Sequence, residues 1–172
     1  MAIKQILTIP DPFLKYKVLY VVNIDDYVRS IIHSMIETMH FHPHCVGLAA
    51  PQLGIDMRIV VVDVSLYPKK HPNSGLIALV NPMIVKSAGR QTAREGCLSV
   101  LEFTGNVSRA DEIEVQGSDL NGNKVELAAK GFESVVLQHE IDHLDGILFL
   151  DRVNSLKTDV FRRKQVCLPQ KK

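Results

Sequence analysis

The sequence predicts one domain of mixed helices and strands, with a helix toward each end of the chain and strands between them. The length of 172 residues suits a single hydrophobic core, and no linker or repeat indicates a second domain, so residues 1–172 are assigned to one domain. Apolar residues recur at helical spacing near residues 30 and 140. The middle holds β-branched runs and an Asn-Gly pair, which are typical of antiparallel strands.

The first helix is expected to begin at Asp25 or Asp26, because either carboxylate can accept hydrogen bonds as an N-cap. Its core-facing residues are Val28, Ile31, Ile32, Met35, Ile36 and Met39. The helix should end in segment 40–44, which contains three histidines, His40, His42 and His44. A second metal site is one interpretation of these histidines, but a histidine-rich loop without a ligand is the simpler one.

The central strands are predicted from β-branched and alternating segments. Residues 57–64 form a buried strand candidate, because four consecutive residues there are β-branched. Residues 76–85 form a second candidate that Pro82 interrupts. An Asn-Gly turn then joins two alternating segments, 112–116 and 124–129, which predicts a β-hairpin.

Charge and hydropathy exclude several classes of function. With 20 basic and 19 acidic residues and a net charge of +1, the chain has no overall attraction for nucleic acid or acidic membranes. The basic run 162–164 is interpreted as a solvated helix end or tail. No apolar stretch reaches the ~18 residues of a membrane span, and residues 1–11 do not resemble a secretory signal. We therefore expect a cytoplasmic protein. Three distant cysteines, Cys45, Cys97 and Cys167, argue against a disulfide scaffold.

The most informative motif is H-E-x-x-H at residues 139–143, inside a helix predicted from Gly131 to Asp145. Side chains four residues apart lie on one helix face, so His139 and His143 can bind one metal ion while Glu140 faces a metal-bound water. The same face carries Phe132, Val135 and Val136, and a second apolar stripe consists of Leu137, Ile141 and Leu144. This helix should therefore be buried between other layers.

The third metal ligand decides the class of enzyme. One group of zinc proteases extends the motif to a further histidine, but that position is Phe149, and no glutamate follows Glu140. Three later aspartates, Asp145, Asp151 and Asp159, remain candidates. Cys97 lies upstream, and its thiolate would complete a two-histidine, one-cysteine set with one position open for water.

Three motifs occur together in order: V-G-L-A-A-P-Q at residues 46–52, E-G-C-L-S at 95–99 and Q-H-E-x-D-H-L at 138–144. Through them the chain resembles the peptide deformylase family, and the similarity covers nearly its whole length. The resemblance implies an α+β fold in which small antiparallel β-sheets surround a central metal-bearing helix. It also implies a metal-dependent hydrolase that removes the N-formyl group from the N-terminal methionine of newly synthesised polypeptides and releases formate.

The resemblance also implies the metal site. Cys97, His139 and His143 would hold one divalent ion, commonly Fe²⁺ in this family, while Glu140 moves protons between water and the leaving amine. Zn²⁺, Ni²⁺ and Co²⁺ suit the same donors, so the sequence leaves the native metal open.

By the same resemblance, the Gln52 side chain and the Leu98 backbone N–H form an oxyanion hole. Read alone, Gln52 would be a loop amide bonded to its own turn. The backbone of Val46, Gly47 and Leu48 is expected to hold the substrate as an added strand. The methionine pocket is assigned to Phe132, Val135 and Val136, for which ordinary core packing is the alternative. Arg109 either lies near the substrate or is a structural partner of Glu95.

Two positions depart from the family pattern, since Cys45 stands where a glycine is normal and Leu101 where proline is common. A side chain at 45 could intrude on the methionine pocket or prevent a glycine-only conformation, whereas the alternative is ordinary packing. Two rival functions remain. A metalloprotease would act on internal peptide bonds, and a non-catalytic peptide-binding relative would keep the metal for structure or use the site only for recognition. The partners that the resemblance implies for the enzyme are N-formyl-Met nascent polypeptides, with the ribosome as a candidate place of contact.

Overall fold

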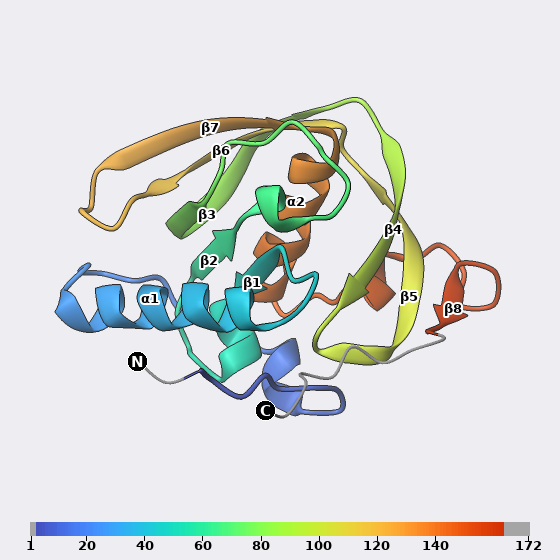
Figure 1. Cartoon of the computed structure of the whole chain (residues 1–172), viewed down its shortest axis with the longest axis horizontal. Coiled ribbons are helices and arrows are strands. Elements are labelled where there is room, and N and C mark those ends of the chain that lie inside the picture. The colour runs from blue at the N-terminus through green and yellow to red at the C-terminus, as the bar shows by residue number, and fades with distance from the viewer. Residues whose placement is uncertain (1–2, 164–172) are drawn as a thin grey trace.

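The structure is a computed structural model that describes residues 3–163, in which two antiparallel sheets enclose a central helix (Figure 1). The strands are β1 Gly47–Ala49, β2 Ile59–Val62, β3 Ile77–Ala88, β4 Gln91–Cys97, β5 Val100–Arg109, β6 Glu112–Ser118, β7 Lys124–Lys130 and β8 Val160–Arg162, and the α-helices are α1 Asp26–Phe41, α2 Gly131–Leu144 and α3 Phe149–Arg152. The larger sheet has the order β1-β2-β3-β6-β7, and the smaller has the order β4-β5-β8. The predicted α+β fold is confirmed.

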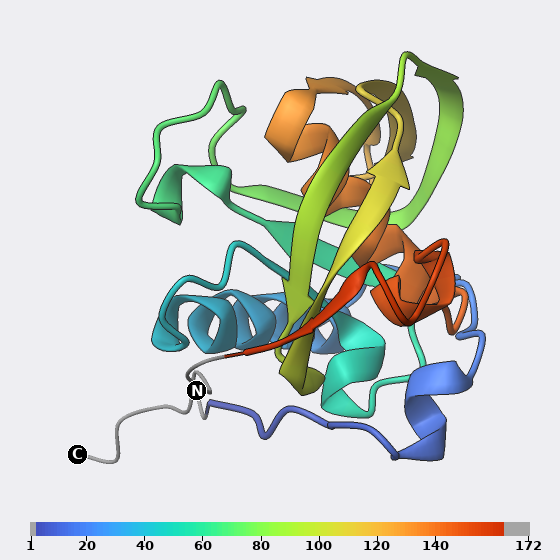
Figure 2. The ribbon, with the colours of Figure 1, turned by 90° about the vertical axis from the view of Figure 1, so that its right-hand side faces the viewer.

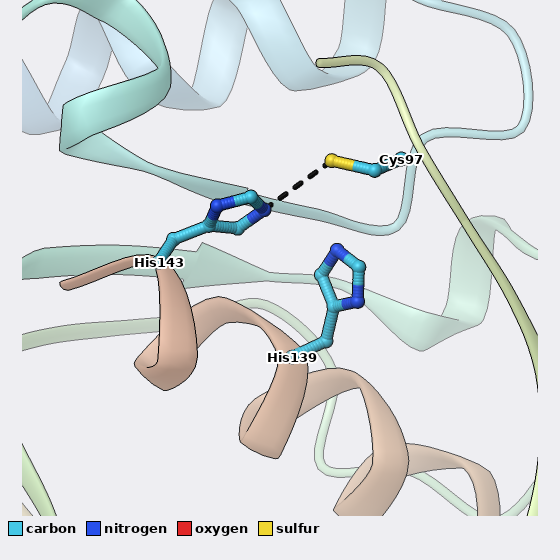
Figure 3. A group of neighbouring side chains, drawn as sticks. All are labelled: Cys97, His139 and His143. Carbon is cyan, nitrogen blue, oxygen red and sulfur yellow. Dashed lines mark hydrogen bonds between the residues drawn. The ribbon is translucent and has the colours of Figure 1, made fainter. Parts of the chain in front are cut away.

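The central helix α2 lies between the larger sheet and the long β4–β5 hairpin (Figures 1 and 2). Its stripe of Leu137, Ile141 and Leu144 packs into a core with side chains of β2, β3 and β6. Its opposite face turns toward Cys97 at the end of β4 (Figure 3). The prediction of a helix buried on two sides is therefore confirmed, and this burial fixes the orientation of its histidines.

Helix α1 packs against the end of the larger sheet that holds β1 and β2. The Asp25 carboxylate accepts a hydrogen bond from the Val28 backbone N–H at 2.9 Å, as predicted for the N-cap. The apolar stripe of α1 forms a core with Leu48, Ile59 and Val61. This packing anchors β1, the edge strand beside the candidate site.

Most predicted strands are present, with altered limits. The buried strand is shorter than expected, at Ile59–Val62, and the next one continues to Ala88 through a shift of register between Val80 and Met83, where Pro82 cannot donate to the ladder. The 112–130 hairpin is confirmed. The interpretation of the basic run as a helix end or tail is wrong for Arg162, which ends strand β8 and pairs with Phe103 of β5, while Lys164 lies outside the described residues. No helix in residues 3–163 has the length and apolar content needed to cross a membrane.

Gly146 follows the C-terminal end of helix α2 and is in the left-handed conformation that favours glycine. Its φ is +70°, and an added Cβ would lie 2.5 Å from the Lys15 backbone oxygen. We expect Gly146→Ala to lower the free energy of unfolding by about 1–2 kcal/mol for the left-handed conformation and by a further ~1–3 kcal/mol for the collision. Urea unfolding would measure the loss.

The matched control is Gly122→Ala in the β6–β7 turn, where φ is +84° but no atom lies within 4 Å of the added Cβ. This variant should lose only the conformational part, about 1–2 kcal/mol. Equal losses of unfolding free energy in the two variants would show that the close approach of Gly146 to the Lys15 backbone does not contribute to stability.

Candidate metal centre and active site

Three potential metal ligands converge in the interior. Cys97 ends β4, and His139 and His143 lie one turn apart on α2 (Figure 3). One donor atom from each of the three lies within 4.8 Å of the other two, and the Cys97 Sγ is 3.3 Å from the His143 Nε2. All three side chains are buried. The structure thus brings Cys97 to the histidines, whereas Asp145 pairs with Arg58 and Asp151 with Lys15.

A buried ion-pair network orients His139. Its Nδ1 donates to Glu95 Oε2 at 2.7 Å, which leaves Nε2 as the atom that can bind a metal. Arg109 makes two hydrogen bonds to Glu95, of 2.7 and 3.0 Å, and a third to Asp142 on α2. Arg109 does not line the cavity described below, so its position is that of a structural partner of Glu95 and not that of a residue beside the substrate.

The electrostatics favour a thiolate at Cys97. Burial alone raises the pKa of this thiol, but His143 and His139 lower it well below its usual value. Burial likewise opposes ionisation of Glu95, yet hydrogen bonds from His139 and Arg109 lower its pKa to about 2. A thiolate with two imidazoles is a donor set that suits a divalent transition metal, and Cys97, His139 and His143 therefore fit such an ion.

Glu140 projects from the same turn of α2 as His139. Burial raises the pKa of its carboxyl to about 7, although His139 and His143 oppose the shift. Its Oε2 atom is buried and has no hydrogen-bond partner among residues 3–163. A buried carboxylate oxygen without a partner is costly, and such groups are typical of catalytic sites.

A cavity of about 280 Å³ opens onto these residues. It is lined by ten of the predicted site residues: Val46, Gly47, Gln52, Cys97, Leu98, Phe132, Val135, Val136, His139 and Glu140. Leu48 is not among them, because its side chain packs into the α1 core. The sequence reasoning missed Arg94 and Arg163, which also line the cavity.

Gln52 is buried and bonded to the metal-ligand loop. Its Oε1 accepts from the Ala49 N–H at 2.9 Å, which directs the amide NH₂ toward the interior. That NH₂ donates to Cys97 Sγ at 3.3 Å and to Ser99 Oγ at 3.2 Å. Gln52 is therefore not a surface-loop amide, and its donor lies beside the metal ligand.

Gly47 lies in edge strand β1 and permits close approach of Glu140. A Cβ at Gly47 would lie 2.5 Å from the Glu140 Oε1 and 2.9 Å from its Cδ. The strand pairs with β2 on one side and has no neighbouring strand on the other in the described sheet. The free edge of β1 can therefore accept an extended peptide.

Cys45 lines the same cavity and is buried. Burial and the nearby Glu140 carboxylate raise the pKa of this thiol to about 12, so it is neutral. Its Sγ donates to the Gly47 carbonyl oxygen at 3.1 Å. The positive φ in this loop belongs to His44, at 63°, and Cys45 itself is not in the left-handed region. Cys167 lies outside the described residues.

The histidine-rich segment does not form a second cluster of metal ligands in the described chain. Among residues 3–163, Cys97, His139 and His143 form the one group with converging donors. His40 Nε2 lies 4.0 Å from Asp63 Oδ2, while His44 lines the cavity.

An H-E-x-x-H helix whose two histidines converge with Cys97, and whose His139 and Glu140 line a cavity, defines a metallohydrolase site. The profile of the family described as "Polypeptide deformylase" matches residues 3–159. The peptide deformylase of Syntrophobacter fumaroxidans is 46% identical over 164 residues, which cover 95% of this chain and 94% of that protein. The chain belongs to the peptide deformylase family and is an enzyme of that class.

Solved structures support the same assignment. A peptide deformylase from Legionella pneumophila is 38% identical with a TM-score of 0.82, covering 91% of this chain and 89% of its own. A peptide deformylase from Synechococcus elongatus, solved in complex with actinonin, is 36% identical with a TM-score of 0.81, covering 90% and 82%. The predicted family and fold are thereby confirmed.

Proposed function

We propose that this protein removes the formyl group from the N-terminal formylmethionine of newly made polypeptides in the cytoplasm, at or near the ribosome. The observation that carries the proposal is the convergence of Cys97, His139 and His143, two of which, Cys97 and His139, line one cavity together with Glu140. We assign Fe²⁺ as the native ion, although the same donors accept Zn²⁺, Ni²⁺ or Co²⁺. A bound divalent ion would lower the pKa of water from about 15.7 toward 7.

The residues of the chain then divide the remaining work. Glu140 accepts a proton from water and returns it to the leaving amine, because its carboxylate is buried beside the ligands and its Oε2 is free among the described residues. The Gln52 NH₂ and the Leu98 backbone N–H stabilise the negative charge that develops on the formyl oxygen. Loss of one such donor typically costs about 3 kcal/mol of transition-state stabilisation.

The substrate is held by backbone and by apolar side chains. The free edge of β1, through the backbone of Val46, Gly47 and Leu48, pairs with the peptide as an added strand. Phe132, Val135 and Val136 face the cavity from α2 and surround the methionine side chain. Arg109 acts behind the ligands, where it holds Glu95 against His139.

Formate release by the Fe²⁺-loaded protein tests the proposal directly. A formyl-Met-Ala-Ser peptide should yield formate and a free amino terminus, whereas acetyl-Met-Ala-Ser should be a far poorer substrate. Cleavage of an internal bond in either peptide would favour a metalloprotease. Tight binding of the formyl peptide without formate would favour a non-catalytic peptide-binding protein.

Cys45 is expected to limit the rate of this reaction. Its thiol narrows the cavity and donates a hydrogen bond to the Gly47 carbonyl oxygen, which belongs to the strand proposed to bind substrate. We predict that Cys45→Gly raises kcat/KM for formyl-Met peptides by about two- to tenfold, since small gains in positioning have large kinetic effects.

The variant Cys45→Ala separates the effect of the thiol from the effect of the Cβ, because alanine removes the thiol and its hydrogen bond to Gly47 but keeps the Cβ. Equal gains in the alanine and glycine variants would assign the effect to the thiol. Kinetics identical to the wild type in both variants would show that Cys45 only packs as a small apolar residue.

A further inference from the structure

Two arginines meet at the cavity from sequence positions far apart. Arg94 lies on β4, two residues before Gly96, and Arg163 follows β8, which pairs with β5 (Figure 2). Both arginines line the cavity that Cys97, His139 and Glu140 also line. Because β8 brings Arg163 across the hairpin, neither β4 nor the C-terminal segment alone would indicate this arrangement.

Arg163 lies directly over the backbone next to the metal ligand. Its Nη2 is 3.5 Å from the Cys97 carbonyl oxygen, and its Nε donates to the Phe103 carbonyl at 3.3 Å. A side chain at Gly96 would collide with this guanidinium. Arg163 is therefore held by backbone carbonyls, which keep its charge and leave further N–H donors for a ligand.

Arg94 is held in a comparable way. Its guanidinium carbon lies 3.6 Å from the centre of the Phe161 ring, and its Nε donates to the Thr104 hydroxyl at 2.9 Å. Among residues 3–163, the Arg94 guanidinium hydrogen-bonds through its Nε, so the N–H groups of its terminal nitrogens remain as donors for a ligand. Within residues 3–163, neither Arg94 nor Arg163 forms an ion pair, whereas Arg162 lies 3.8 Å from Glu102.

We propose that Arg94 and Arg163 form a carboxylate-binding subsite that favours formylated polypeptides with aspartate or glutamate within the first residues after methionine. The inference rests on the proposed deformylation. Cys97, Arg94 and Arg163 line the same cavity. An extended chain advances about 3.3 Å per residue, so the few residues that follow a formylmethionine bound at Cys97 are long enough to reach across this cavity to the arginines. Planar guanidiniums with free N–H pairs match the geometry of a carboxylate.

The test compares formyl-Met peptides with Asp or its neutral isostere Asn at positions 2, 3 and 4. For the wild-type protein at low salt, we expect kcat/KM to be about fivefold higher with Asp than with Asn at one of these positions. The preference should shrink at high salt, because the arginines are partly exposed to solvent. Equal kcat/KM for Asp and Asn at all three positions would overturn the proposal.

Substitutions then identify the residues responsible. In Arg94→Gln/Arg163→Gln the Asp-to-Asn ratio should fall to about one, while Arg94→Lys/Arg163→Lys should keep part of it. The matched control is Arg162→Gln, which alters a neighbouring surface arginine on β8 and should keep the full ratio. An unchanged ratio in the double Gln variant would overturn the assignment.

Equilibrium binding separates this inference from the proposed function. The Glu140→Gln protein should bind formyl-Met peptides with Asp more tightly than the Asn peptides, and the preference should disappear when Arg94→Gln and Arg163→Gln are added. If no formyl peptide yields formate but this preference persists, the deformylation proposal fails while the subsite stands. If formate is released but Asp and Asn peptides bind and react equally well, the subsite proposal fails and the deformylation proposal stands.

Discussion

Glu140→Ala is expected to retain the bound metal and to lose about 10²–10⁴-fold in kcat for formyl-Met peptides. The three ligands are on other residues, so the metal site should survive. The residue that accepts the proton from water would be missing. Among residues 3–163, the other carboxylate that lines the cavity is Glu95, which is engaged by His139 and Arg109. Formate release and elemental analysis of the same protein would measure both quantities.

Glu140→Gln is the control for packing, because it preserves the size of the side chain but not its ability to take a proton. The two variants should be similarly inactive. A glutamine variant with wild-type turnover would remove Glu140 from proton transfer, and loss of metal from both variants would give it a structural role instead.

The site residues that lie on one helix were predictable from the sequence, whereas the ligand from a distant strand was predictable only as one candidate among several. His139, Glu140 and His143 follow from the periodicity of a single helix, which is a local property. Cys97 lies 46 residues from His143, so spacing alone could not exclude the later aspartates. The structure brings Cys97 to the histidines because β4 ends against the cavity face of α2.

The residues that the sequence reasoning missed depend on long-range pairing. Arg94 and Arg163 share a cavity only because β8 pairs with β5, and a three-residue strand in a polar, basic segment has no distinct periodicity. The β4–β5 hairpin was missed as well, since its residues mix charged, polar and small types without a strong turn signal. By contrast, the capping aspartate and apolar stripe of α1 and the Asn-Gly hairpin are local signals, and both elements formed as predicted.

The second large effect is expected from Gly47→Ala. The added methyl would lie 2.5–2.9 Å from three atoms of the Glu140 side chain, so the carboxylate must move. A displacement of about 1 Å can reduce the rate a hundredfold, and we expect kcat to fall by roughly that factor. Steady-state formate release would measure it. Gly117→Ala in β6 is the control for a strand glycine outside the cavity, and it should keep the wild-type kcat.

A double-mutant cycle decides whether Gly47 acts through Glu140. If the methyl group works by displacing the carboxylate, Gly47→Ala should have little further effect on kcat in the Glu140→Ala background, because residues in contact are not additive. If the methyl instead blocks pairing of the peptide with β1, the rate losses of Gly47→Ala and Glu140→Ala should multiply in the double variant. Gly47→Ala should then also raise KM, both in the wild type and in the Glu140→Ala background. Full additivity would therefore contradict the steric account and assign Gly47 to substrate binding alone.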